Sequence, residues 1–202
     1  MSLPIAAILL LTCTLSLTAQ ERATTASGRI VLLYPDGTWK YAPPAVNLPM
    51  SGRTRPSTAT EHIDLARGRA ALYFDPSKWK VTKSEEAGRM TLSHTNGDGY
   101  ALVLAERIQV SLGGLRKIAL DNAKDAAPDA RIVSEEHRTV NGVDILAMRI
   151  EGTIQGLAFA YFGYYYAGKE GTFQVLTYTA VNLFDEYRPD FENLLDGFVL
   201  VP

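Results

Sequence analysis

The sequence predicts an α+β protein in which an antiparallel β-sheet is flanked by helices. Over residues 62–202, short apolar or alternating runs are separated by turn residues, which is typical of antiparallel strands. Two segments, 111–126 and 184–198, instead carry apolar residues at helical spacing. A stretch rich in Pro, Ser and Thr, residues 43–61, has no apolar periodicity. It predicts a linker between this main domain and a smaller N-terminal element, residues 28–42.

The chain begins with a segment typical of export. The first 20 residues carry no charged side chain, and residues 5–11 form an unbroken apolar run. Small and hydroxyl residues follow it up to Ala19. We expect residues 1–19 to be a removable signal peptide, which makes the mature chain periplasmic or extracellular.

Two alternatives to a removable signal remain open. A membrane anchor needs about 20 apolar residues, and this run is shorter and is broken by threonine and serine. Lipid anchoring at Cys13 is the second alternative, because residues 10–13 resemble a bacterial lipobox. Cys13 is the only cysteine, so a chain cut after Ala19 has no disulfide, no catalytic thiolate and no cysteine-based zinc site.

The N-terminal element is predicted to be a β-hairpin. A β-branched and apolar run, residues 28–34, is followed by Pro-Asp-Gly and by an aromatic run, residues 38–41. Pro-Asp-Gly favours a tight turn between two strands. An isolated hairpin is marginally stable in water, so Trp39 is a candidate contact with the chain's own domain or with another protein.

The first half of the main domain is predicted to hold strands and one helix. Residues 70–74 indicate a strand, and residues 89–94 and 100–108 flank a turn and indicate a hairpin. Apolar residues then recur at helical spacing over 112–126. Ser111 is the expected N-cap of this helix.

The second half is predicted to be a meander of long strands. Residues 132–140 are polar on both faces, which favours an edge strand. Asn141-Gly142 is a strong hairpin signal, and residues 143–150 are expected to pair back. Residues 157–166 are apolar on both faces and are expected to be central, with 173–181 returning beside them.

The last helix is predicted from a wide apolar stripe over residues 184–198. Pro189 is tolerated in the first turn of a helix or at a break. We therefore expect the helix proper to begin around Arg188 and to end at Gly197.

This order of elements resembles the PsbP-like α/β/α sandwich superfamily. The resemblance is carried by residues 70–79, 163–166, 171–174 and 193–198, together with the middle helix, and covers roughly residues 62–201. It implies an antiparallel sheet between helices. It also implies proteins that bind or stabilise partners, and it supplies no residues with assigned roles.

Aromatic residues crowd the strand predicted over 157–166. Tyrosine is favoured at interfaces because it combines apolar area with a polar tip. A sheet core between helices explains most of these rings. Tyr164 and Tyr166, near the end of the strand, are the candidate exceptions for contact with a ligand or partner.

The sequence indicates no catalytic, cofactor or metal site. His62, His94 and His137 are not at ligand spacing, and neighbouring residues of 135–137 point to opposite faces of a strand. His94 is expected to be a hydrogen-bonded histidine of the core or rim. Neither a nucleophile elbow nor a phosphate-binding loop is present.

These observations predict a class of function rather than a reaction. The net charge of −2, without a concentrated basic face, argues against a nucleic-acid partner. We expect an exported, non-catalytic accessory or binding protein of the cell envelope, whose partner is an envelope protein or a small ligand. The alternative is an envelope-polymer hydrolase with two paired carboxylates, which requires a cleft and a raised carboxyl pKa.

Overall fold

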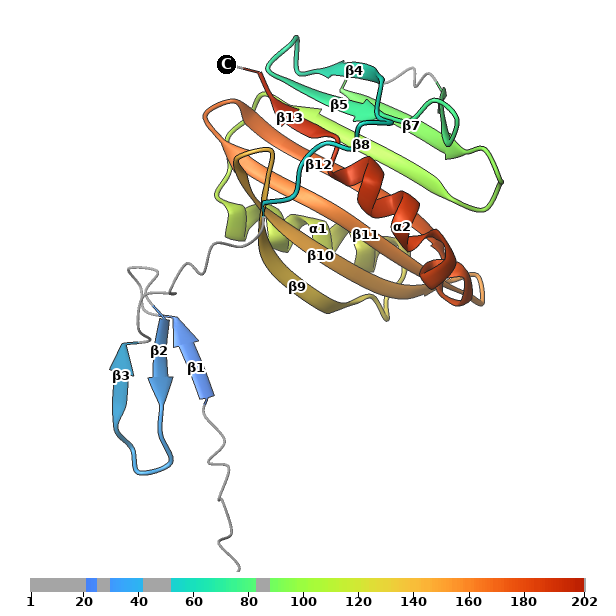
Figure 1. Ribbon diagram of the computed structural model, residues 1–202. Coiled ribbons are helices and arrows are strands. Elements are labelled where there is room, and N and C mark those ends of the chain that lie inside the picture. Colours follow the sequence, from blue (N-terminus) through green and yellow to red (C-terminus); the bar gives the residue numbers. More distant parts are fainter. Residues whose placement is uncertain (1–20, 25–29, 42–51, 83–87, 202) are drawn as a thin grey trace, which may run out of the picture. The chain divides into compact units, whose positions relative to one another are not determined.

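A computed structural model describes residues 21–24, 30–41, 52–82 and 88–201 (Figure 1). The expected signal peptide, Cys13 and residues 43–51 of the expected linker lie outside the described residues. The chain divides into two compact units, Met1–Leu48 and Pro49–Pro202.

The N-terminal unit holds a three-stranded antiparallel sheet in the order β1-β2-β3. Strand β2 (Ile30–Leu33) pairs with β3 (Trp39–Tyr41) across the expected turn, and Gly37 takes the positive φ of 81° that this turn requires. Asp36 accepts hydrogen bonds from the amide and hydroxyl of Thr38. Strand β1 (Glu21–Thr24) pairs with β2 and extends the predicted hairpin by one strand.

The main unit is built on a seven-stranded antiparallel sheet in the order β6-β7-β8-β12-β11-β10-β9 (Figure 1). Strand β9 lies at the edge, as its polar sequence predicts, and β11 is interior. The positive φ angles of Asn141 and Gly142 form the predicted turn between β9 and β10. The seven strands are β6 (Trp79–Thr82), β7 (Arg89–His94), β8 (Tyr100–Glu106), β9 (Arg131–Val140), β10 (Val143–Ile154), β11 (Leu157–Gly168) and β12 (Gly171–Ala180).

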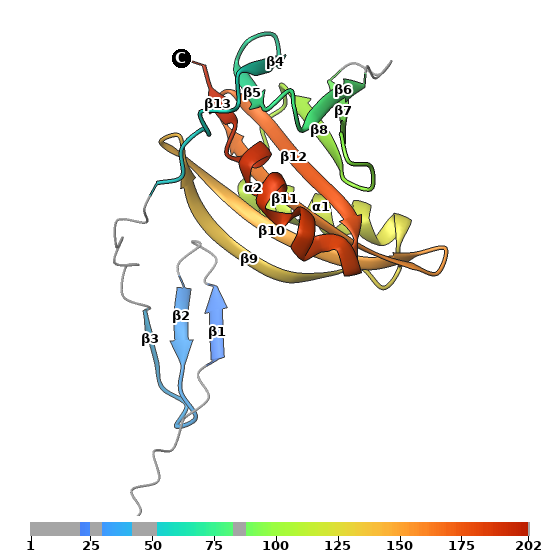
Figure 2. The same ribbon diagram turned by 45° about the vertical axis from the view of Figure 1, so that its right-hand side comes forward.

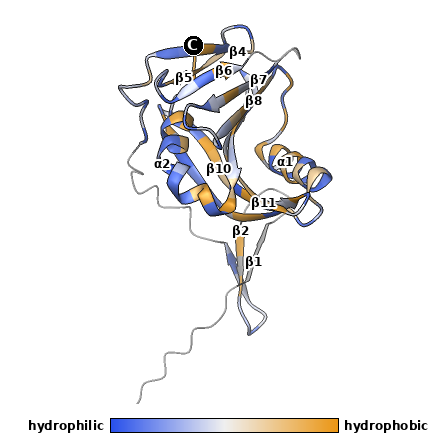
Figure 3. Cartoon of the chain, turned by 90° about the vertical axis from the view of Figure 1, so that its right-hand side faces the viewer, coloured by the Kyte–Doolittle hydropathy of each residue, from blue (hydrophilic) through white to orange (hydrophobic). Residues whose placement is uncertain are grey.

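Helices cover the two faces of this sheet, as Figure 3 shows for α1 and α2. Helix α1 (Leu112–Ala126) begins at Ser111, whose Oγ accepts a hydrogen bond of 3.0 Å from the amide of Gly114. This confirms the predicted N-cap. Leu115 and Ala119 of α1 are buried against the sheet.

Helix α2 (Phe184–Leu195) begins one turn earlier than the sequence predicts. The expected start at Arg188 was wrong, because Pro189 lies inside the helix. A short 3₁₀ turn, η1 (Val181–Leu183), leads into α2. Burial of Phe184 and Tyr187 on the core side offsets the one backbone hydrogen bond that Pro189 cannot donate.

A small antiparallel sheet, in the order β13-β5-β4, completes the main unit. Its strands are β4 (Glu61–Leu65), β5 (Ala70–Phe74) and β13 (Phe198–Leu200). Helix α2 crosses the large sheet and leads into β13 (Figure 2). Gly197 permits this junction, because a Cβ there would lie 1.9 Å from the carbonyl oxygen of Tyr73.

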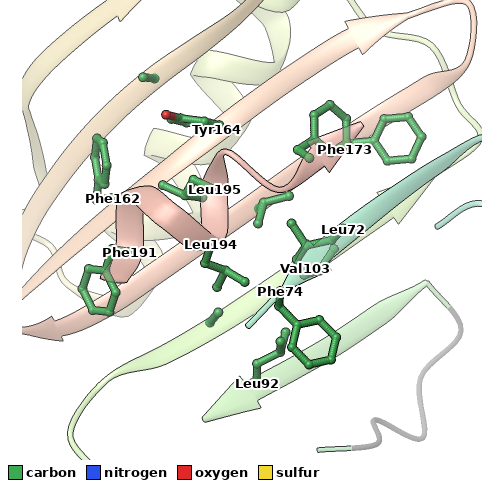
Figure 4. Packing of buried hydrophobic residues seen from close by; sticks show 14 of the residues in the cluster. Leu72, Phe74, Leu92, Val103, Phe162, Tyr164, Phe173, Phe191, Leu194 and Leu195 are labelled. Carbon is green, nitrogen blue, oxygen red and sulfur yellow. The ribbon is translucent and has the colours of Figure 1, made fainter. Parts of the chain in front are cut away.

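The main core lies between the large sheet, α2 and the small sheet (Figure 4). Leu72, Val103, Phe173 and Phe191 meet there from four different elements. A second, smaller core lies under α1. No helix in the described part of the chain is long and apolar enough to cross a membrane.

Candidate functional site

The helix α1 face of the large sheet carries a groove beside the helix. Strand register places Leu102, Leu176 and Gly163 in one cross-strand row over β8, β12 and β11. Because side chains alternate between the two faces of a strand, Leu104, Gln174 and Tyr165 form a second row on the same face. Helix α1 packs on β9, β10 and β11, and the groove runs beside it over β8 and β12.

This α1 groove has a volume of about 390 Å³ and a largely apolar lining. Its floor comes from β8, β10, β11 and β12, one wall from α1 and the opposite rim from β7. The lining residues are Arg89, Leu102, Leu104, Ala119, Asn122, Ala123, Ala126, Ile150, Tyr161, Tyr165, Gln174 and Leu176.

A glycine in β11 shapes the floor of the groove. A Cβ at Gly163 would lie 2.5 Å from Cδ2 of Leu176 and 2.9 Å from the carbonyl oxygen of Val175. Gly163 therefore lets the side chain of Leu176 lie across the neighbouring strand. A side chain at Gly163 would lift Leu176 and narrow the groove.

Two polar side chains face this apolar lining. Gln174 is buried, and burial raises the pKa of Tyr165. Within the described part of the chain, the fully buried side-chain polar atoms that lack a partner are Nε of Arg149 and Oγ1 of Thr179. The polar atoms of Gln174 and Tyr165 are not among them, and both residues line the groove. The amide of Gln174 and the hydroxyl of Tyr165 are thus placed to bind a polar group inside the groove.

A row of three tyrosines borders the groove at one end. Tyr100 and Tyr178 stack with ring centroids 5.3 Å apart, and Tyr161 lies 5.4 Å from Tyr178. Burial raises the pKa of Tyr161 and Tyr178, so both hydroxyls stay protonated at neutral pH. The rings extend the apolar surface beyond the groove itself.

Trp39, Tyr164 and Tyr166, which the sequence proposed for binding, are not among the residues that line the groove. Trp39 is in the N-terminal unit, where its side chain is 56% exposed and its ring contacts Tyr41 edge-on. Tyr164 and Tyr166 lie on the α2 face of β11, opposite to the groove. Tyr164 and Tyr166 thus share one face of β11, and Trp39 belongs to the other unit.

Tyr164 belongs to the core rather than to a surface (Figure 4). Its hydroxyl donates to Oδ1 of Asp196 at 2.9 Å and accepts from Arg138 at 2.9 Å. Tyr166 is partly buried, packs against Phe173 and Phe198, and donates to the carboxylate of Glu170. Burial in the sheet core, which the sequence analysis expects for most rings of this strand, thus accounts for Tyr164.

Asp196 is the centre of a polar cluster around Tyr164. Arg53 donates through Nε to both carboxylate oxygens of Asp196, at 2.8 and 3.0 Å. This bond raises the pKa of Arg53. Asn141 donates to the carbonyl oxygens of Asp196 and Phe198, both at 2.7 Å. The cluster joins the start of the main unit to the end of α2.

His94 is a structural histidine, as its place on an apolar face predicts. Its ring is buried between Trp79 and Tyr187. Nδ1 accepts from the amide of Asn96 at 3.2 Å, so Nε2 carries the proton that it shares with Asp190 at 3.0 Å. Both ring nitrogens are engaged, and His94 is not placed to act as a base. The described residues contain no group of three or more His, Cys, Asp or Glu side chains that could hold a metal ion.

The carboxyl groups give no support to the hydrolase alternative. That alternative requires at least one carboxyl whose pKa is raised. The shifts found in the described residues are downward, because hydroxyl and amide donors stabilise the charged form of each carboxylate. The four residues are Asp36, Asp75, Asp129 and Glu170.

The groove was not predicted from the sequence. The alternation of Leu102 with Leu104, and of Gln174 with Leu176, indicates that each pair shares a face. The sequence does not show which face of the sheet these pairs occupy, or that α1 leaves this face partly open. Both depend on the pairing of strands about 70 residues apart in the chain. That pairing is not a local property of the sequence.

These features define a PsbP-like α+β fold with a groove on its α1 face. The solution structure of the cyanobacterial PsbP protein CyanoP from Synechocystis sp. PCC 6803 has a TM-score of 0.53 and 10% sequence identity. The match covers 72% of this chain and 95% of CyanoP. The expected resemblance to the PsbP-like superfamily is thus confirmed for the fold.

Two further solved structures are similar at lower scores. A protein of unknown function from Pseudomonas aeruginosa, PA94, has a TM-score of 0.47 and 10% identity, over 70% of this chain and 97% of that one. LpqN from Mycobacterium tuberculosis, involved in cell envelope biogenesis, has a TM-score of 0.42 and 8% identity. That match covers 70% of this chain and 90% of LpqN. No family model and no curated protein matches the sequence.

Proposed function

We propose that this chain is an exported, non-catalytic binding protein that holds a small amphipathic ligand in the α1 groove. The observation that carries the proposal is a largely apolar groove of about 390 Å³ that Gln174 and Tyr165 line with one polar side chain each. Small-molecule sites are typically apolar clefts of roughly 300–1,000 Å³ with a few fixed polar groups. The ligand has an apolar body and one uncharged or weakly polar head.

The two parts of such a ligand have distinct places in the groove. Leu102, Leu104 and Leu176 supply apolar area for the body, and burial of that area drives binding. Gln174 can both donate and accept, and Tyr165 can donate, so a hydroxyl or carbonyl head satisfies them. These contacts fix the orientation of the ligand.

Leu102→Glu tests the groove. The substitution places a charge on the partly exposed floor, so we expect it to weaken binding of the apolar fluorophore N-phenyl-1-naphthylamine by at least about tenfold. The matched control is Leu157→Glu, because Leu157 is 61% exposed and does not line the groove. Fluorescence titration measures both, with thermal unfolding as the check on folding.

Two results would contradict the binding proposal. One is the absence of saturable fluorophore binding to the wild-type chain. The other is equal weakening by Leu102→Glu and Leu157→Glu. Because Leu102 is only partly buried, the variant should remain folded.

Export is proposed from residues 1–19, which lie outside the described residues. We expect the chain recovered from a periplasmic or culture fraction to begin at or near Gln20, because signal peptidase cuts after small residues such as Ala19. Intact-mass spectrometry measures this. A full-length chain confined to the cytoplasm would refute export, and loss of membrane association in Cys13→Ala would establish the lipid-anchored alternative instead.

A further inference from the structure

A second hollow lies on the opposite face of the large sheet, between α2 and the edge strands. It has a volume of about 320 Å³ and is lined from β9, β10, β11 and α2. Strand register puts Arg149 opposite Ser134, and Ala147 opposite Glu136, so that these residues share the α2 face. Phe162 and Phe184 form its apolar base. We call this hollow the arginine pocket.

Three arginines from three different elements line the pocket. Arg138 comes from β9, Arg149 from β10 and Arg188 from α2. The side chains of Arg138 and Arg149 are only 12% and 23% exposed. Such burial of guanidinium groups costs solvation free energy that partners must offset.

The guanidinium group of Arg149 is fixed by its neighbours. Its central carbon lies 3.8 Å from the centre of the Phe184 ring, a cation–π contact. One Nη pairs with Glu151 at 2.6 Å. Its Nε, however, is buried and has no hydrogen-bond partner among the described residues. Arg149 is therefore held in place, with one donor that is buried rather than open to solvent.

The carboxylates around the pocket are already engaged. Glu136 is bound by Arg138, and Glu135 by Arg116 of α1 at 2.6 Å. Glu192 accepts from Arg53 at 3.1 Å and, more weakly, from Arg188 at 3.4 Å. Arg138, Arg149 and Arg188 are themselves paired, with Glu136, Glu151 and Glu192 respectively. Because each guanidinium has five N–H donors, the surplus in the pocket is one of donors, and its lining holds three arginines and two glutamates.

A surplus of guanidinium donors calls for a ligand group that only accepts. We infer that the arginine pocket binds a phosphate monoester. Three guanidinium groups from three elements match in number the three terminal oxygens of a phosphoryl group. The pocket exceeds the size of a phosphate, which leaves room for the ester's organic part against the lining that Phe162 and Phe184 complete. This site is on the other face from the α1 groove and does not depend on the proposed function.

The test is calorimetric titration of the full chain with phenyl phosphate, inorganic phosphate and benzoate at about 0.15 M ionic strength. We expect phenyl phosphate to bind most tightly, because it uses both the arginines and the rings. Arg149→Met keeps the apolar stem over Phe184 and should weaken binding at least about tenfold. Arg188→Gln, at an exposed position, should weaken it severalfold with no loss of folding.

Arg107→Gln is the matched control, since Arg107 is exposed, follows β8 and does not line the pocket. It should leave binding within about twofold of wild type. The inference is overturned if no phosphate compound binds saturably up to about 10 mM, which would make the arginines a purely structural ion-pair network. Equal binding of benzoate and phenyl phosphate, or equal loss in Arg107→Gln and Arg188→Gln, would also overturn it. Tighter binding of inorganic phosphate than of phenyl phosphate would refute the ester in favour of free phosphate.

Discussion

Replacing Asp196 with alanine is expected to lower the free energy of unfolding by about 3–5 kcal/mol. Asp196 is 5% exposed, and its carboxylate holds the Arg53 guanidinium and the Tyr164 hydroxyl. The substitution leaves a partly buried cation and a buried hydroxyl without their acceptor, which costs more than the pair contributes when intact. Urea unfolding followed by circular dichroism measures the change.

Two companion variants separate this effect from the loss of any aspartate. Asp64→Ala removes an exposed carboxylate from a strand of the same unit, and should change stability by no more than about 0.5 kcal/mol. Asp196→Asn keeps an acceptor of the same shape and should cost less than alanine. A loss in Asp196→Ala as small as that in Asp64→Ala would show that the cluster around Tyr164 does not hold the unit together.

Phe191→Ala is expected to lower the free energy of unfolding by about 3–5 kcal/mol, because it leaves a cavity in the main core. Phe191 is 0% exposed and contacts the rings of Trp79, Phe184 and Tyr187. Trp79 belongs to β6, and Phe184 and Tyr187 belong to α2. The cavity would therefore remove packing between the helix and the sheet. The same unfolding measurement applies.

Leu157→Ala is the control for Phe191→Ala, because it removes apolar atoms at a side chain already exposed to water. It should cost well under 1 kcal/mol. If Phe191→Ala unfolds at the same urea concentration as Leu157→Ala, then α2 does not pack on the sheet as described.

The strands and helices with strong local signals could be predicted from the sequence. Ser111 marks the start of α1, and Asn141-Gly142 marks the turn at the edge of the sheet, because each acts through its own backbone. Strands β1, β4, β6 and β13 were not predicted. Strand β13 is only three residues long, and its first residue, Phe198, continues the apolar stripe of α2.

The sites could be predicted far less well, because they depend on residues distant in the chain. The bond between Arg53 and Asp196 spans 143 positions, and the floor of the α1 groove needs β8 paired with β12. A crowded aromatic strand indicated binding at Tyr164, but alternation sends that ring into the core. The place of Gln174 in the groove and the arginine pocket have no local signature in the sequence.

The most direct test of the α1 groove is a titration of methyl-labelled protein with decanol, followed by nuclear magnetic resonance. The hydroxyl of decanol supplies the polar head, and its chain supplies the apolar body. We predict saturable shifts of the methyl signals of Leu102, Leu104 and Leu176, while Leu92 and Leu194, buried on the other face, stay unchanged. Shifts confined to Leu92 and Leu194, or no saturable shift at the groove leucines, would contradict the account.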